Sequence, residues 1–243
     1  MNLKLFLGTW LAGLPGVAAF AWLVLPILVA DRPLPLPLWV VQLASASQSA
    51  ALLAVAAFLG ATLAHKVNLS TPTLIAFLEA KSISKSLRQQ LIPGIIGGII
   101  GAAILWLFTR FAPDVLAQAQ AKFSMPALVR LLYGGITEEI LIRWGFMTLF
   151  VWLFWRFIQK GKGSPSAVIM YAAIVISALF FGIGHLPAVS AMMGSISPCV
   201  AVYIVTANAA FGLVAGWLFW RFGLESAILA HVLAHATTLL LPW

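Results

Sequence analysis

Two carboxylates and a guanidinium lie close together within one long apolar stretch of the sequence. Glu138, Glu139 and Arg143 fall within six residues, and charged groups in such a stretch are costly unless they are paired or face a wet cavity. Glu139 precedes Arg143 by four residues, which is the favourable order for an ion pair on one helical face. Glu138 is turned by about 100° from Glu139, so we expect it to be an unpaired carboxylate and a candidate general base. The alternative is one buried structural cluster of all three groups.

Three of the four histidines follow toward the C-terminus. His185 comes after Gly182 and Gly184, which leave space beside the backbone, whereas His231 and His235 are four residues apart on one helical face. That pair could hold one metal ion or one substrate oxygen. A single histidine in an apolar helix also fits an interhelical hydrogen bond, but three histidines with two glutamates favour a chemical site.

Several other chemistries lack their signatures. The sequence contains no H-E-x-x-H zinc motif, no G-x-S-x-G elbow and no phosphate-binding glycine loop. The single cysteine, Cys199, excludes an intramolecular disulfide and a thiolate-rich metal site. His65 stands beside Lys66 at the end of an apolar run, and we interpret it as an interfacial residue without a chemical role.

The elements that must position these residues are membrane helices. The chain has 243 residues, of which 63% are apolar and 8% charged, with a mean hydropathy of +1.06, and this balance is typical of a chain dissolved in lipid. We predict an all-α polytopic transmembrane bundle in a single membrane domain, 1–243, with six to eight spans and a polar intramembrane active-site cavity. The N-terminal run is interpreted as a retained helix rather than a signal peptide. The seven predicted spans are 5–30, 37–64, 90–110, 126–158, 166–187, 198–220 and 224–242.

Basic residues at the ends of the spans predict the orientation. Nine of them would share one side and four the other, which by the positive-inside rule places the N-terminus in the cytoplasm. The nine are Lys4, Lys66, Lys81, Lys85, Arg88, Arg156, Lys160, Lys162 and Arg221, and the four are Arg32, Arg110, Lys122 and Arg130. We expect an integral protein of a bacterial inner membrane, with residues 65–90 as a cytoplasmic loop or an interfacial helix. Because the basic residues do not alternate with aromatic ones, no nucleic-acid partner is expected.

The predicted spans create one geometrical difficulty. His185 would lie near the outer end of its span and His231 near the inner end of its own, so both reach Glu138 only if helices tilt, break or re-enter. Pairs of glycines four apart, such as Gly94/Gly98 and Gly212/Gly216, predict close packing of helix backbones.

The charged and histidine motifs together resemble a known family. Glu138-Glu139-x-x-x-Arg143, Phe181-x-x-x-His185 and His231-x-x-x-His235 are similar to the three ordered motifs of the CPBP intramembrane proteases, which include the Rce1-type CAAX prenyl endopeptidases and the Abi proteins. The resemblance covers about residues 126–240, which we expect to be the catalytic core. Residues 1–110 resemble the family only in being hydrophobic helices.

The resemblance implies a role for each of the six residues. Glu138 and His185 would activate the attacking water, His231 and His235 would stabilise the tetrahedral oxyanion, and Glu139 and Arg143 would support the site. The family commonly has asparagine where this chain has His235, and a further histidine strengthens the case for a metal. If zinc is bound, Glu138, His185, His231 and His235 would be its ligands; otherwise no cofactor is expected.

The sequence therefore predicts an intramembrane endopeptidase, glutamate-dependent or metal-dependent. Its partners would be membrane lipids and a peptide or protein substrate, cleaved in a membrane-associated or C-terminal segment. Two alternatives belong to other functional classes. An ion- or proton-coupled transporter would predict two related halves with broken helices, and the sequence shows no such symmetry. A non-catalytic immunity or scaffolding protein would use the polar cluster for structure alone.

Overall fold

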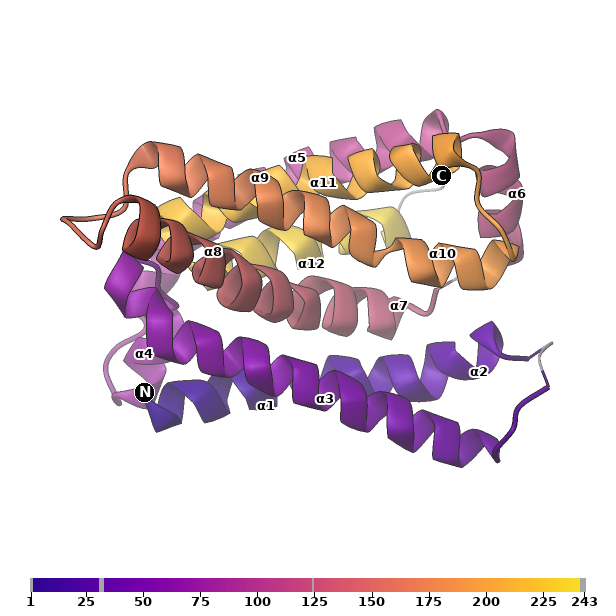
Figure 1. The fold of residues 1–243 in the computed structure, drawn as a ribbon, viewed down its shortest axis with the longest axis horizontal. Helices are drawn as coiled ribbons and strands as arrows, with labels where there is room; N and C mark the ends of the chain where they lie inside the picture. Colours follow the sequence, from indigo (N-terminus) through magenta and orange to yellow (C-terminus); the bar gives the residue numbers. More distant parts are fainter. Residues whose placement is uncertain (1, 31–32, 124, 241–243) are drawn as a thin grey trace.

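The computed structural model describes residues 2–30, 33–123 and 125–240, and these form helices and loops without a strand (Figure 1). Stretches of π- or 3₁₀-helix are labelled η. In chain order the helical segments are α1 (Leu3–Ala19), η1 (Phe20–Val24), α2 (Leu25–Leu28), α3 (Leu38–Leu63), η2 (Ala64–Val67), α4 (Pro72–Leu78), α5 (Ser84–Arg110), α6 (Asp114–Lys122), α7 (Ala127–Val129), η3 (Arg130–Thr137), η4 (Ile140–Met147), α8 (Thr148–Leu153), η5 (Phe154–Ile158), α9 (Ala167–Gly184), α10 (Leu186–Met193), α11 (Pro198–Phe222) and α12 (Leu224–Leu240).

Six continuous helical runs among the described residues are long and apolar enough to cross a membrane, and α12 is apolar but shorter. The six runs are Leu3–Leu28, Leu38–Val67, Ser84–Arg110, Ala127–Ile158, Ala167–Met193 and Pro198–Phe222. The predicted fold class, an all-α polytopic bundle of about seven spans, is confirmed.

The helix ends differ from the predicted ones at two places. α5 begins at Ser84 rather than near residue 90, because the long side chains of Lys85 and Arg88 can extend from a helix to water. The fifth run continues past residue 187 to Met193, because Pro187 occupies the first turn of α10, where a missing N–H costs nothing. The predicted end of the last helix at residue 242 lies outside the described residues.

Successive runs alternate in direction, so the start of α1, the helix α4 and the loop 159–166 share one end of the bundle (Figure 1). We call this the basic end, because the nine basic residues predicted to share one side belong to segments that meet there. Arg110 and Arg130 belong to segments at the opposite end. Arg32 and the side chain of Lys122 lie outside what the structure describes.

The run from α7 to η5 is central and is called the central span. It lies between α1 and α3 on one side and α9, α11 and α12 on the other (Figure 1). Its own glycines and those facing it allow close contact: a Cβ added to Gly145 would lie 2.6 Å from the Ala56 side chain of α3. Gly60 of α3 in turn lies directly against the Trp144 ring. The central span therefore contacts both layers.

A glycine face of α5 packs against α12. A Cβ added to any of its four buried glycines would approach a side chain of α12 or α11 within 2.9 Å. These glycines are Gly94, Gly97, Gly98 and Gly101. Gly212 and Gly216 of α11 likewise lie against Ala178 and Ile174 of α9. The packing role predicted from the small-residue spacing is confirmed, because dispersion contacts between close backbones hold helices together in lipid.

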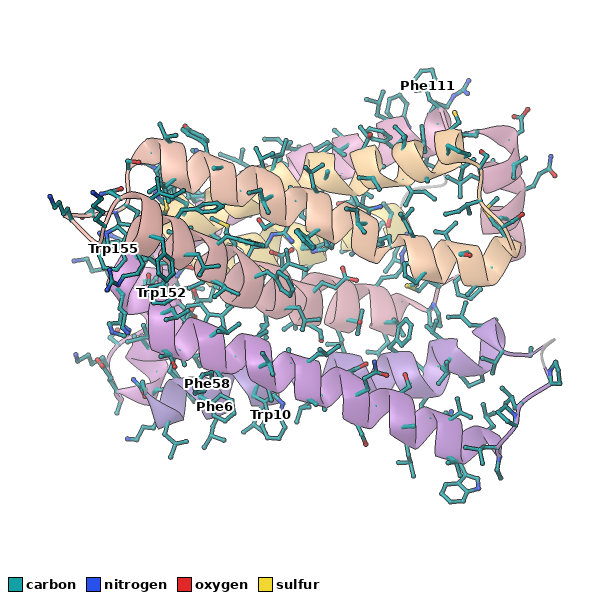
Figure 2. The ribbon with its side chains drawn as sticks, in the orientation of Figure 1. Phe6, Trp10, Phe58, Phe111, Trp152 and Trp155 are labelled. Atoms are coloured by element: carbon teal, nitrogen blue, oxygen red, sulfur yellow. The ribbon has the colours of Figure 1, made fainter. Side chains whose placement is uncertain are left out.

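Aromatic side chains project from the outer surface of the bundle (Figure 2). Phe6 and Trp10 of α1 stack with ring centroids 6.2 Å apart, and Phe58 of α3 projects nearby. At the basic end, the indole N–H of Trp155 donates to the Gly163 carbonyl oxygen at 2.8 Å. Trp at the end of a span is typical of the membrane–water interface, so this end of the bundle has the chemistry of an interface.

Glu225 attaches the start of α12 to α4. Its Oε1 accepts a hydrogen bond from the Leu74 backbone N–H at 2.8 Å and another from the Thr71 hydroxyl. Leu74 lies in the first turn of α4, where the residue before the helix supplies no side-chain cap. The Leu224 N–H also donates to the Ser70 carbonyl oxygen at 3.1 Å. Glu225 thus caps a helix that is distant in sequence and fixes the start of α12.

We expect Glu225→Ala to lower the free energy of unfolding by about 1–2 kcal/mol, because the capping acceptor is lost and two donors become unpaired. Thermal unfolding of the detergent-solubilised protein measures this loss. Glu79→Ala is the matched control: Glu79 is exposed and pairs only with Lys81 at 2.7 Å, so its removal should change stability by at most about 0.5 kcal/mol. Equal effects of the two changes would contradict the capping role.

Candidate functional site

The two adjacent glutamates lie between π-helical stretches of the central span. η3 ends at Thr137 and η4 begins at Ile140. Thr148 Oγ1 donates a hydrogen bond to the Arg143 carbonyl oxygen, five residues back, at 3.2 Å and so reinforces a wide turn. Thr137 Oγ1 donates to the Gly13 carbonyl oxygen at 2.7 Å and so joins the central span to α1. π-Helical turns are rare and frequent at functional sites. Here they set the directions in which the two carboxylates point.

Glu139 is fully buried and has two partners. Its Oε2 pairs with Arg143 Nε at 3.3 Å, and both side chains are 0% exposed. Its Oε1 accepts a hydrogen bond from His231 Nδ1 of α12 at 2.8 Å. The pair predicted from the four-residue spacing is present, and Glu139 also joins the central span to α12.

Arg143 extends these contacts to two more helices. Its Nη2 donates to the Gly212 carbonyl oxygen of α11 at 3.2 Å, and its guanidinium lies 4.8 Å from the centroid of the Phe181 ring of α9. A cation over an aromatic face is stabilised by the ring quadrupole. Four helical runs therefore meet around one buried ion pair.

Glu138 lies apart from this pair and lines a cavity of about 250 Å³. It is half-buried, and no hydrogen bond to it is formed by the residues that the structure describes. His185, His231 and His235 line the same cavity, whereas Glu139 and Arg143 do not. The four residues to which the resemblance gives water activation and oxyanion binding thus line one cavity, and the other two lie outside its lining.

His185 reaches the cavity from the junction of α9 and α10. His185 is a turn residue between the end of α9 at Gly184 and the start of α10 at Leu186, so one of the helix breaks that the predicted spans required is present there. Its Nδ1 lies 2.8 Å from the Phe181 carbonyl oxygen. A carbonyl oxygen only accepts, so Nδ1 carries the hydrogen, and Nε2 of the neutral ring is an acceptor.

The rings of His231 and His235 stack, with centroids 4.9 Å apart and planes inclined by 24°. Phe211 of α11 lies 4.5 Å from the His231 ring. Gly134 provides room for the second ring, because a Cβ there would lie 2.9 Å from His235 Nε2. The buried Nδ1 of His235 has no partner within the described part of the chain.

The four side chains that line the cavity are the ones that the resemblance implies as zinc ligands if a metal is bound. No three His, Cys, Asp or Glu side chains of the described residues are grouped so that they could hold an ion. The cavity wall carries the unpaired carboxylate of Glu138, the Nε2 acceptor of His185 and the rings of His231 and His235.

Sequence reasoning missed three polar residues of the cavity wall, Thr109 of α5 and Tyr203 and Asn208 of α11. The Tyr203 hydroxyl donates to the Phe108 carbonyl oxygen, and Asn208 Nδ2 donates to the Ile204 carbonyl oxygen at 2.8 Å. The signal that the sequence offered was Asn208, an amide side chain within an apolar run. It is weak, because neutral polar groups often serve only to pack membrane helices.

Residues 120–237 match a protein-family model described as type II CAAX prenyl endopeptidase, Rce1-like. The matched segment contains all six of the charged and histidine residues discussed above. No curated protein and no solved structure matches the chain significantly. The resemblance identified from the three motifs is confirmed by the family match.

We expect Arg143→Met to lower the free energy of unfolding by about 3–5 kcal/mol, because the buried carboxylate of Glu139 loses its cationic partner and keeps only the hydrogen bond from His231. Chemical or thermal unfolding in detergent measures the effect. Arg156→Met, which changes an exposed arginine of the same span, is the matched control and should have little effect. The double variant Glu139→Gln/Arg143→Met should regain part of the loss, and strict additivity of the two changes would contradict a direct pair.

Proposed function

We propose that this protein is an intramembrane endopeptidase in which Glu138 and His185 activate the attacking water, because residues 120–237 match the family model of the Rce1-like type II CAAX prenyl endopeptidases. The observation that carries the proposal is the convergence of Glu138, His185, His231 and His235 on one cavity inside the helical bundle. Peptide hydrolysis needs a base, a polarised water and donors aimed at the developing oxyanion. The cavity wall supplies side chains of each kind.

Water addition would begin at Glu138 and His185. The unpaired carboxylate of Glu138 takes a proton from a water molecule, while Nε2 of His185 accepts a hydrogen bond from the same molecule and orients it. The water oxygen then forms a bond to the carbonyl carbon of the substrate. The carbonyl π electrons move to oxygen and give a tetrahedral oxyanion. When this intermediate collapses, the C–N bond breaks and the leaving amine takes the proton held by Glu138.

The two stacked histidines would bind the oxyanion. Glu139 holds the Nδ1 hydrogen of His231, so Nε2 of that ring is available to the cavity. In its protonated form this ring donates from Nε2, and the Glu139 carboxylate offsets its charge, as a buried carboxylate orients the histidine of a serine-protease triad. His235 is the second donor. Arg143 acts on the reaction only through Glu139, so it is a positioning residue.

The substrate we propose is a membrane-associated or C-terminal peptide segment. Lipid surrounds the bundle, and the wall of the cavity beyond the four polar residues is mainly apolar, with Leu105, Phe108 and Ile204 among its members. A peptide that is itself embedded in the membrane or anchored to it would reach such a cavity without leaving lipid. We further propose that the basic end faces the cytoplasm, because it collects nine basic residues.

We expect Glu138→Gln to lower peptide cleavage by about 10²–10⁴-fold, because the change keeps the shape of the side chain and removes the base. The assay uses a fluorogenic peptide ending in a farnesylated C-a-a-X sequence and the same peptide without the farnesyl group. Glu79→Gln, an exposed change on α4's C-terminal side, is the matched control and should keep full activity. Full activity of Glu138→Gln would favour the scaffolding alternative, and cleavage of neither peptide by the unaltered protein would favour the transporter or scaffold.

A metal analysis of the purified protein distinguishes the glutamate mechanism from a metal-dependent one. The present arrangement of side chains supports a glutamate mechanism, so we expect less than stoichiometric zinc and cleavage that persists in a chelator. Stoichiometric zinc that is lost from Glu138→Ala and His231→Ala variants, together with cleavage abolished by the chelator, would contradict the glutamate mechanism and favour a metalloprotease.

A further inference from the structure

A second cavity lies at the basic end of the bundle, apart from the one that contains Glu138. It has a volume of about 470 Å³ and is bounded by α1, α3 with its continuation η2, and α4. Trp144 of the central span forms part of its wall, and the two cavities share no lining residue among those that the structure describes. This volume is within the usual range of about 300–1,000 Å³ for ligand cavities.

Trp144 brings an unused hydrogen-bond donor to this cavity. Its side chain is 1% exposed, and its indole Nε1 has no partner among the described residues. The edge of the ring that carries Nε1 lies against Gly60, which also lines the cavity. An indole N–H can only donate, and a buried donor without an acceptor is costly. The cavity is therefore suited to an occupant with an acceptor oxygen.

The lining changes from polar to apolar with depth. Asn2, His65 and Glu79 lie at the outer end, whereas Ala61 and Trp144 lie further in. Gly60 precedes the end of the second run at Val67 by seven residues, which corresponds to ~10 Å along a helix. The cavity thus extends from the interface to about the depth at which headgroups give way to acyl chains.

The charges around the outer end suit an anionic headgroup. Lys4 and Lys66 are exposed and are sequence neighbours of the lining residues Leu5 and His65. The one carboxylate of the rim, Glu79, is paired with Lys81 at 2.7 Å, so its charge is offset. Lysines near a membrane surface attract anionic lipids.

We propose that this cavity binds one anionic glycerophospholipid from the leaflet at the basic end, with an ester carbonyl oxygen accepting from Trp144 and the headgroup beside Lys4 and Lys66. The proposed lipid site is separate from the cavity that contains Glu138, and it does not depend on the proposed function. A lipid supplies each feature that the cavity calls for: an acceptor at apolar depth, a chain for the apolar wall and a charged group for the rim.

Native mass spectrometry of the delipidated, detergent-solubilised protein tests the proposal, with dioleoyl phosphatidylglycerol as the titrated probe. We expect one saturable lipid per chain and an apparent Kd that rises about two- to tenfold in Trp144→Phe, because one hydrogen bond is lost while the ring contacts are kept. Trp106→Phe, which changes a tryptophan that is 52% exposed on α5, is the matched control and should leave the Kd unchanged.

Ala61→Leu provides a second variant that fills the cavity and keeps Trp144. It should lower the occupancy by the lipid, and thermal unfolding checks that each variant is folded. Unchanged binding in folded Trp144→Phe and Ala61→Leu proteins, or no saturable binding to the unaltered protein, would overturn the proposal and leave water as the acceptor for Trp144. Because the measurement reads mass rather than cleavage, its outcome is independent of whether the protein is a protease.

Discussion

The relative position of the helices that line the first cavity depends on one buried carboxylate, that of Glu139. A charge removed from water is tolerated only when partners of good geometry offset its desolvation, and Glu139 takes one partner from its own span and one from α12. Arg143 in turn requires the Gly212 carbonyl oxygen and the Phe181 ring. Apolar packing alone would tolerate rotation or sliding of α12, whereas these directional contacts fix both the height and the rotation of His231.

The two adjacent glutamates have different surroundings, although they lie within one helical turn. Glu139 points into the bundle and contacts Arg143 and His231, while Glu138 lines the cavity. The π-helical stretches on both sides widen the helix at this point. The widening is maintained by tertiary contacts, such as the hydrogen bond from Thr137 to the Gly13 carbonyl oxygen of α1, so the first helix contributes to a site that it does not line.

The sequence was sufficient for the spans and for the charged part of the site, because a charged group in lipid has few explanations. Glu138, Glu139 and Arg143 therefore stood out, and both the ion pair of Glu139 with Arg143 and the separate direction of Glu138 followed from helical spacing. Asn208, Tyr203 and the π-helical turns did not stand out, because neutral polar side chains are common in membrane helices and wide turns depend on partners from other segments. The unpaired indole N–H of Trp144 could not be predicted for the same reason, because its lack of an acceptor depends on how the helices pack.

The contacts of α12 extend beyond the segment recognised by the family model. α12 carries His231 and His235, yet its longest packing face lies on the glycines of α5 and its first turn is attached to α4, and both partners precede residue 120. A chain cut down to the recognised segment would leave this face uncovered and Glu225 without its donors. The N-terminal half, which lies outside the family match, is thus the support against which the helix carrying His231 and His235 is packed, and substitutions in it are tolerated only as far as that support is kept.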